Sequence, residues 1–397
     1  MVLFDDSERN HLLPLVFTRP VAELRIGILT ISQKWQKHIG GTVSWDTQDY
    51  LQDKFPKSIS SDLLKINGRV LPDEQLAEAV VSLADGYALF DKSGLVIAYR
   101  SDQRFSSFKP DALQKVLYPH ACNFINRTYD LFSLNGVELE RDFKLLTKGR
   151  RSADIKGNNT LIGEENIFAE SGALVSASVI NATTGPVYLA ADSEIMEGCL
   201  VRGGLSLGEH AVLKMGAKIY GPTTIGPHCK VGGEVNNSVF LGYSNKAHDG
   251  FLGNSVIGEW CNLGADTNNS NLKNNYLGVK LWNYVSKRFE NTGLQFCGLI
   301  MGDHSKCGIN TMFNTGTVVG VSSNIFGSGF PRNFIPSFGW GGAQGFETFE
   351  LNKAFEVMEK VMERRQMPLT ETDKKIFEHI FKETAESRYW EKKPLQA

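Results

Sequence analysis

Among the eight histidines of the chain, His248 has the surroundings best suited to catalysis. It lies within residues 244–253, a polar stretch with glycines that interrupts a regular repeat. An imidazole titrates near neutral pH, so it can take a proton from an amine. We interpret His248 as a candidate general base, with a structural or surface histidine as the alternative.

A second polar stretch follows closely. Asn262 comes 14 residues after His248, and Ala265 and Asn271 come soon after Asn262. In a coiled chain whose turns stack, residues about one coil apart lie one above another. The spacing therefore predicts that Asn262 lies near His248, with Ala265 at the adjacent corner.

The elements that must hold these residues repeat every six positions. Every sixth residue is aliphatic over residues 189–231, glycine often follows it, and the residue four positions on is usually small. A period of six is typical of a hexapeptide solenoid, in which each short strand sends one side chain inward and roughly 18 residues complete a coil. The frame consists of Leu189, Ile195, Val201, Leu207, Leu213, Ile219, Ile225 and Val231, returns at Phe251, Ile257 and Leu263, and returns again at Met301, Cys307, Phe313, Val319 and Ile325.

The frame breaks twice, between Val231 and Phe251 and between Leu263 and Met301. Insertions into solenoids form loops on one side, and such loops often carry the binding face. The second break is rich in asparagine and basic residues, a composition that suits a polar ligand but is also common in solvated loops. We expect loops at both breaks.

The regions on either side lack the repeat. Residues 1–150 predict a mixed α/β domain with strands at 63–71, 87–90 and 95–99 and a helix at 73–83. Residues 151–345 would form the solenoid.

Residues 346–397 predict a helical tail. Leu351, Phe355, Met358 and Met362 lie on one face of a helix, and Thr370 can cap a second helix. We expect the tail to pack on the end of the solenoid or on a neighbouring subunit.

Residues 246–272 resemble a known enzyme family, the bifunctional N-acetylglucosamine-1-phosphate uridylyltransferase/glucosamine-1-phosphate acetyltransferases. That family has a Lys-Ala-Gly-His motif, then an aromatic residue before Leu-Gly, then Ile-Gly, Asn-Ile-Gly-Ala-Gly-Thr and Asn-Tyr. The resemblance covers roughly residues 155–330 and implies a left-handed parallel β-helix. The matching residues are Lys246-Ala247-His248, Phe251-Leu252-Gly253, Ile257-Gly258, Asn262-Leu263-Gly264-Ala265-Asp266-Thr267 and Asn271-Leu272, without a gap from His248 onward.

The resemblance implies acetyl transfer from acetyl-CoA to the amine of a sugar phosphate, glucosamine 1-phosphate in the family. His248 would deprotonate the amine, and the Ala265 N–H would bind the oxyanion. Asn262 would hold the sugar, and Asn271 would contact acetyl-CoA or the substrate.

The family's cofactor is flanked by positions near Ile309 and Phe326. Its members are trimers with sites between subunits, so the resemblance implies a homotrimer.

Three departures from the family concern the acceptor. Phe251 lacks the hydroxyl of the family's tyrosine, and Asn236 or Asn237 replaces a lysine. The phosphate-binding arginine falls at or next to Lys218 and Tyr220. Phosphate contacts would then come from Lys218, Lys246 or Lys280.

Residues 12–20 resemble the end of the sugar nucleotidyltransferase signature, Pro-Leu-Thr-x-x-x-Pro-Lys. Residues 5–9 replace the phosphate-binding glycine loop, and Arg69 stands where the family has a metal carboxylate. The region thus resembles a divergent, trimmed nucleotidyltransferase domain, as in the alternative bacterial form of the bifunctional enzyme. It would either use UTP with Mg²⁺, with Arg19 and Arg25 as candidate phosphate contacts, or be a relic that supports assembly.

The composition limits the classes of binding partner that we expect. The net charge is −2 and no basic stripe stands out, so we expect neither nucleic acid nor a membrane as a partner. The six cysteines form no CxxC pair, which is typical of a reduced cytoplasmic protein, and the N-terminus has no signal core.

Other function classes remain open. The chain could be a nucleotide-sugar pyrophosphorylase, or a non-catalytic nucleotide-sugar-binding protein whose solenoid is structural. A γ-type carbonic anhydrase also uses this solenoid but needs three zinc-binding histidines, two of them close in sequence. His210, His228, His248 and His304 lack such a pair.

Overall fold

The computed structural model describes residues 1–57, 64–101 and 112–391. Its contacts divide the chain into two compact units that alternate near the N-terminus. The predicted boundary at residue 150 lies inside the second unit, because the helices after residue 128 pack with the solenoid. The first unit comprises residues 1–12, 18–24 and 29–127, and the second comprises residues 13–17, 25–28 and 128–397.

The first unit is built on a six-stranded mixed sheet of order β4-β1-β5-β8-β7-β9. Strands β4, β1 and β5 run parallel, as do β7 and β9, whereas β8 is antiparallel to both β5 and β7. The strands are β1 Val2–Phe4, β4 Ser44–Asp46, β5 Leu64–Asn67, β7 Tyr87–Phe90, β8 Val96–Arg100 and β9 Gln114–Leu117, with a separate antiparallel pair of β6 Val70–Leu71 and β10 Asn123–Phe124 and a short β3 Leu29–Thr30.

Two helices accompany this sheet, α1 Ile31–Ile39 and α2 Glu74–Val81. Thr30 caps α1 in a capping box with Gln33, and the Asp73 carboxylate caps α2. The predicted helix and the strands near 87–90 and 95–99 are confirmed. The predicted strand at 63–71 is two strands separated by a turn, and its first residue, Leu63, lies outside the described residues. The 3₁₀ helices are η1 Ser7–Leu12, η2 Val21–Glu23 and η3 Asp49–Leu51.

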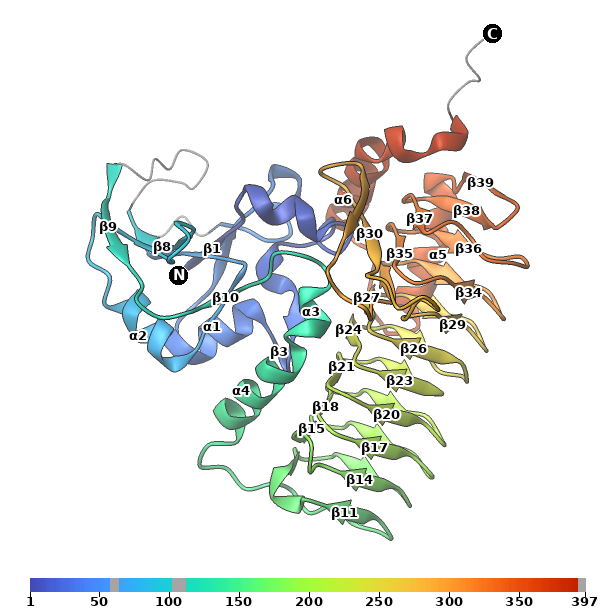
Figure 1. Cartoon of the computed structure of the whole chain (residues 1–397), viewed down its shortest axis with the longest axis horizontal. Coiled ribbons are helices and arrows are strands. Elements are labelled where there is room, and N and C mark those ends of the chain that lie inside the picture. The colour runs from blue at the N-terminus through green and yellow to red at the C-terminus, as the bar shows by residue number, and fades with distance from the viewer. Residues whose placement is uncertain (58–63, 102–111, 392–397) are drawn as a thin grey trace. The chain divides into compact units, whose positions relative to one another are not determined.

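The second unit contains a parallel β-helix with three sheets, here called faces 1, 2 and 3, and Figure 1 shows its coils stacked in chain order. Face 1 comprises β11 Thr160–Ile162, β14 Val179–Asn181, β17 Leu200–Arg202, β20 Lys218–Tyr220, β23 Glu234–Asn236 and β26 Phe251–Gly253. Face 2 comprises β12 Ile167–Ala169, β15 Val187–Leu189, β18 Leu205–Leu207, β21 Thr223–Ile225, β24 Val239–Gly242, β27 Val256–Glu259, β32 Leu299–Met301, β35 Thr317–Val319 and β37 Phe334–Ile335. Face 3 comprises β13 Leu174–Val175, β16 Glu194–Ile195, β19 Val212–Leu213, β22 Lys230–Val231, β25 Asn245–Lys246, β28 Asn262–Leu263, β33 Lys306–Cys307, β36 Asn324–Ile325, β38 Gly339–Gly342 and β39 Gly345–Thr348, the last of which is antiparallel to β38.

The repeating aliphatic residues form the interior of the solenoid. All the frame positions over residues 189–231 and 301–325 are buried in one hydrophobic core, which confirms the predicted solenoid. One position of the frame was wrong. Leu252 points inward in place of Phe251, because the next inward residue, Ile257, follows Leu252 after five positions rather than six.

The two breaks in the repeat differ in kind. The first contains no inserted loop, contrary to expectation, because β23, β24 and β25 continue the three faces without interruption. The second break is an insertion that carries the antiparallel hairpin β30 Lys280–Asn283 and β31 Arg288–Asn291. Beside it, β29 Asn268–Asn269 pairs in parallel with β34 Met312–Phe313.

Helices at both ends of the second unit pack on the solenoid. Helix α3 spans Asp130–Ser133 and α4 spans Asn135–Thr147. Buried Asn135 joins three segments: its side chain accepts from the Gly27 N–H at 2.8 Å and donates to the Pro222 carbonyl at 3.0 Å. The short strand β2 Arg25–Ile26 is thereby held against the solenoid, and a 3₁₀ turn, η6 Glu164–Asn166, lies in the first coil.

The predicted tail forms α5 Leu351–Glu363 and α6 Glu371–Glu383, followed by η7 Ala385–Ser387 and η8 Tyr389–Glu391. Thr370 caps α6 in a capping box with Asp373, as predicted. The ring of Phe377 on α6 packs edge-on against His304 of the solenoid, with centroids 5.2 Å apart. The tail therefore packs on its own chain. Over the described residues, no helix is long and apolar enough to cross a membrane.

Candidate functional site

His248 lies at the corner where the chain passes from β25 on face 3 to β26 on face 1. In the next coil Asn262 pairs with Asn245, and around the corner the Asp266 N–H donates to the Asp249 carbonyl at 3.0 Å. This register places Ala265 directly over His248. The structure thus brings the predicted neighbours together, and Ala265 rather than Asn262 stacks on the histidine.

The backbone of Ala265 presents a hydrogen-bond donor beside this histidine. Its carbonyl accepts from the Asn310 N–H at 2.9 Å, whereas its own N–H makes no hydrogen bond within the described part of the chain. His248 is exposed and Ala265 is half-buried. An exposed imidazole can act as a general base, and an unused backbone N–H beside it can bind an oxyanion.

The corner immediately below His248 is unusually tight. Two residues separate Val231 from Glu234, whereas four separate Lys246 from Phe251 at the same corner one coil later. Gly233 has φ +70°, and a Cβ at this position would lie 2.8 Å from the His248 carbonyl oxygen. Glycine is therefore required beneath the histidine, because any side chain would displace the corner.

Lys246 occupies an inward position, in the column that holds Val231 and Leu263 in the neighbouring coils. Only 1% of this residue is exposed. Its ammonium donates to the carbonyl oxygens of Gly232 at 3.2 Å and His248 at 2.7 Å, and it also reaches that of Asp249 at 3.3 Å. Lys246 therefore holds the histidine corner from inside, and it is not placed to contact a phosphate as the sequence suggested. A lysine at an inward position of the repeat is the signal that could have revealed this role. The repeat did not place Lys246 inward, because the preceding coil is shortened.

Other predicted ligand residues lie on the outer side of face 1. Lys218 is exposed, and the Tyr220 hydroxyl donates to the Glu234 carboxylate at 2.6 Å. In the coils above, the Phe251 ring and the Asn271 amide both approach Gly253, where a Cβ would meet either of them at 2.6 Å.

Asn271 is held in place by its neighbours. Its side chain donates to the Asn254 carbonyl oxygen at 2.8 Å, and its backbone carbonyl accepts from the Cys297 N–H at 2.9 Å. Lys280 is exposed on the hairpin of the insertion.

Ile309 follows Ala265 in the same column of the corner, and Phe326 lies on the coil after it. Both are exposed apolar side chains, at 71% and 43%. Met215 is exposed at the same corner three coils below Ala265. Apolar side chains therefore flank the histidine corner at both ends, as a cofactor or a neighbouring subunit would require.

Asn262 lies on the outer side of face 3 and lines a pocket of about 540 Å³ that sequence reasoning missed. Its other polar lining residues come from neighbouring coils and from the end of α5, which are far apart in the sequence. The signal that could have revealed it is the run of polar residues at one outward position of successive coils.

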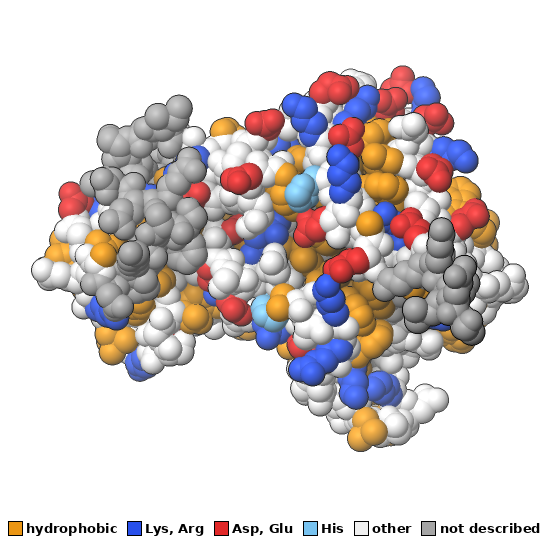
Figure 2. All heavy atoms as spheres, turned by 90° about the horizontal axis from the view of Figure 1, so that it is seen from above, with side chains coloured by type: hydrophobic (Ala, Val, Ile, Leu, Met, Phe, Trp, Pro, Cys, Tyr) orange, Lys and Arg blue, Asp and Glu red, His pale blue; other side chains and the backbone are white. Residues whose placement is uncertain are grey.

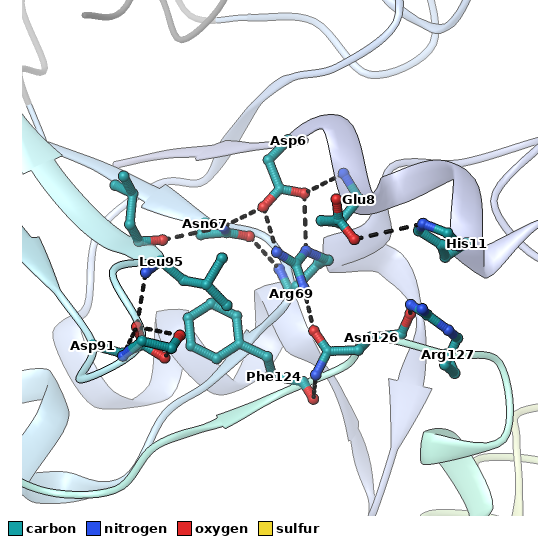
Figure 3. Close-up of polar contacts among 12 residues, drawn as sticks. Asp6, Glu8, His11, Asn67, Arg69, Asp91, Leu95, Phe124, Asn126 and Arg127 are labelled. Atoms are coloured by element: carbon teal, nitrogen blue, oxygen red, sulfur yellow. Dashed lines mark hydrogen bonds and ion pairs between the residues drawn. The ribbon is translucent and has the colours of Figure 1, made fainter. Parts of the chain in front are cut away.

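The first unit contains a buried ion pair at the positions where the sequence departs from the nucleotidyltransferase signature (Figure 3). Arg69 is fully buried and its guanidinium donates to both carboxylate oxygens of Asp6. Asn67 also donates to Asp6, at 2.8 Å, and Asn126 accepts from Arg69. Because β1 and β5 are adjacent parallel strands, Asp6 and Arg69 follow their neighbouring ends.

Asp5 is similarly engaged in the first unit. It accepts from the Val21 N–H at 3.0 Å and lies 3.2 Å from the Arg9 guanidinium, while burial raises its pKa. Arg19 is also buried in this unit. Arg25 belongs to the second unit and donates to the carbonyls of Ile28 and Leu241, so it ties its segment to the solenoid.

His210 and His228 stack with their ring centroids 4.9 Å apart, at a different corner from His248. Over residues 1–57, 64–101 and 112–391, no group of three His, Cys, Asp or Glu side chains is arranged to hold a metal. All six cysteines are free thiols, and five of them are buried.

Comparison with known proteins gives a match for the N-terminal region. Residues 1–151 match the family model for sugar nucleotidyl transferase. A comparison with curated protein sequences finds no match. Among solved structures, an Arabidopsis UDP-N-acetylglucosamine acyltransferase is similar at 13% identity, over 60% of this chain and 92% of that chain, with a TM-score of 0.22.

The class of protein follows from the parts together. The chain joins a nucleotidyltransferase-like α/β region to a parallel β-helix. This combination supports a transferase of sugar-nucleotide metabolism.

Replacing Arg69 by Met should lower the free energy of unfolding by about 3–5 kcal/mol, because the Asp6 carboxylate would stay buried without its cation. The double variant Asp6→Asn/Arg69→Met should recover part of that loss in urea unfolding followed by circular dichroism. Arg100→Met, which removes a more exposed ion pair with Asp85, should cost about 1 kcal/mol or less. Equal losses for Arg69→Met and Arg100→Met would contradict the role given to the buried pair.

Lys246 should give the folded chain a characteristic pH dependence. Burial lowers the pKa of its ammonium from 10.5 to about 8. Between these values the unfolded chain binds more protons, so the contribution of Lys246 to the free energy of unfolding should rise with pH. Urea unfolding from pH 7.5 to 10 should therefore show the wild type gaining stability relative to Lys246→Met. The exposed-site control Lys280→Met should run parallel to the wild type, and parallel curves for Lys246→Met would contradict the assignment.

Proposed function

We propose that the solenoid transfers the acetyl group of acetyl-CoA to the amine of a sugar phosphate, with glucosamine 1-phosphate as the first acceptor to test. The observation that carries this proposal is the stacking of exposed His248 beneath the unused N–H of Ala265. The resemblance of residues 246–272 to the acetyltransferases and the nucleotidyltransferase match of residues 1–151 both support a sugar-phosphate acceptor.

The reaction requires one proton transfer and one exchange of bonds at the acetyl carbonyl. The amine nitrogen attacks the thioester carbon while His248 takes the amine proton, and the carbonyl oxygen becomes an oxyanion. The Ala265 N–H donates to that oxyanion, a role in which removing one donor typically costs about 10²–10³ in rate. This attack forms the C–N bond. Collapse of the tetrahedral intermediate then restores the carbonyl and breaks the C–S bond, and the sulfur leaves as CoA thiol with the proton that the imidazolium returns.

Two features position the base. Lys246 fixes the carbonyls of the corner from inside the solenoid, and Gly233 leaves room for the corner from below. Asn262 lies on face 3, and the Asn271 amide lies beside Gly253 of face 1, which suits contacts to acceptor and cofactor on either side of His248.

We also propose a homotrimer with the active site between subunits. The exposed side chains of Met215, Ile309 and Phe326 along the histidine corner support a contact with another molecule. Light scattering after size exclusion should give the mass of three chains, about 132 kDa from three times 44.0 kDa. The mass of a single chain would contradict the trimer.

Nucleotidyl transfer by the N-terminal region is a second candidate, favoured by the family match of residues 1–151. The donor set at the ends of β1 and β5 does not fit Mg²⁺, because Arg69, Asn67 and the Glu8 N–H already occupy both oxygens of Asp6. Release of pyrophosphate from UTP and N-acetylglucosamine 1-phosphate would establish this activity independently of the solenoid.

Replacing His248 by Ala should lower the rate of CoA release from acetyl-CoA and glucosamine 1-phosphate by about 10²–10⁴, the usual contribution of a general base. Trapping the released thiol with a chromogenic disulfide measures this rate. His379→Ala removes an exposed histidine of α6 and should leave it unchanged. A His248→Ala variant that turns over near the wild-type rate would refute the mechanism.

A further inference from the structure

The pocket on face 3 lies between the solenoid and the end of α5. Its volume of about 540 Å³ is in the range of small-ligand sites. Ala247, next to His248, lines it, so the pocket borders the histidine corner. The lining residues that concern the argument are Lys230, Asn245, Asn262, Lys306, Arg364 and Arg365.

Four of these residues form a column on the solenoid surface. Lys230 pairs with Asn245, Asn245 pairs with Asn262, and Asn262 pairs with Lys306 in successive coils of face 3. Because parallel strands lie about 4.8 Å apart, the two amides are adjacent and a lysine stands at each end. The spacing suits a ligand with hydroxyl groups and an anionic end.

The charges of the pocket have one sign. Lys230, Lys306, Arg364 and Arg365 line it, and its lining includes no Asp or Glu. Within the described part of the chain none of the four forms an ion pair. The arrangement contrasts with the face seen in Figure 2, where basic and acidic side chains are interspersed.

The two arginines of the pocket repel the ammonium of Lys230. Burial together with Arg365, Lys214 and Arg364 lowers the pKa of Lys230, and burial lowers that of Lys306 to about 8. A bound anion would favour the charged form of both lysines and so raise their pKa values.

Asn245 lines the pocket, and its side-chain oxygen is buried. This oxygen makes no hydrogen bond to a described residue, although buried polar atoms are usually paired. Stacked Tyr243 and Trp260, with ring centroids 4.4 Å apart, add an aromatic wall, a surface that suits the apolar side of a sugar ring.

A purely structural explanation covers only part of this cluster. Arg364 and Arg365 follow the last turn of α5, where cations are favoured, and Arg365 donates to the His228 carbonyl at 3.0 Å. Lys306 also has a structural partner, because its ammonium donates to the His304 carbonyl at 2.9 Å. The structural explanation leaves Lys230 unaccounted for, and the Asn245 oxygen has no partner among the described residues.

We propose that this pocket binds the acceptor sugar phosphate, with Lys230, Lys306, Arg364 and Arg365 around the phosphate and Asn245 and Asn262 on the sugar. The inference rests on the proposed acetyl transfer for the identity of the ligand. It makes the C-terminal tail part of the acceptor site, in place of the phosphate contacts by Lys218, Lys246 or Lys280 that the sequence suggested.

Calorimetric titration of the full chain tests the proposal. Lys306→Met and Arg364→Gln should each weaken binding of glucosamine 1-phosphate by about tenfold or more, because each removes a charge-assisted hydrogen bond. Lys353→Met, on the same helix but outside the pocket, should bind as the wild type does. Inorganic phosphate should compete, glucosamine without phosphate should bind far more weakly, and thermal unfolding should show that the variants remain folded.

The outcomes separate this inference from the proposed reaction. His248→Ala should keep the wild-type affinity for glucosamine 1-phosphate while losing turnover. Pocket-dependent binding by a wild type that transfers no acetyl group would uphold the pocket and refute the reaction. Turnover with an unchanged KM for the acceptor in Lys306→Met and Arg364→Gln would refute the pocket alone. Loss of CoA binding without loss of sugar-phosphate binding would also refute it, because the pocket would then hold the cofactor.

Discussion

Burial of one side chain per short strand is the interaction on which the solenoid depends. Each strand of two to four residues is too short to be stable alone, but stacking it on its neighbour completes the backbone hydrogen bonds and covers the inward side chain. The interior is therefore a set of columns in which each position is aliphatic or small. Because the backbone must return to the same place in every coil, the outward residues of successive coils also form columns. The candidate site is made from those outward columns and from one corner.

Lys246 shows what happens when the interior rule is broken. A lysine replaces an aliphatic residue in the column between Val231 and Leu263, and its ammonium is satisfied by carbonyls of the corner that carries His248. The corner formed by Gly232 and Gly233 is two residues shorter than the corner above it, and this brings those carbonyls within reach of the ammonium. A buried charge with fixed partners makes the corner rigid, and rigidity at a base is what catalysis by positioning requires. A local loss of regularity in the repeat therefore coincides with the candidate catalytic corner.

The N-terminal region has a comparable substitution. Asp6 stands in the place of a glycine loop and Arg69 in the place of a metal carboxylate, and the two side chains neutralise one another. Two departures that look independent in the sequence are therefore one structural change. The pair stabilises the ends of β1 and β5 without offering the open carboxylates that a metal-dependent nucleotidyltransferase needs. In contrast, the cations that line the pocket beside α5 form no ion pair with a described residue, which suits an anionic ligand.

The sequence by itself determined the solenoid, because one inward residue in six is a local rule that the periodicity displays directly. It also determined that His248, Asn262 and Ala265 lie in neighbouring coils, since coil length fixes which residues stack, and it located both tail helices through their apolar faces and the cap at Thr370. Only the tertiary structure decided the finer register, namely that Ala265 stacks on His248, that Leu252 rather than Phe251 points inward, and that Lys246 is internal. These points depend on the exact number of residues in each coil and corner, which a fixed period of six does not specify. Likewise, no local pattern brings Lys230 and Lys306 to Arg364, because that contact depends on how a helix distant in sequence packs across the coils.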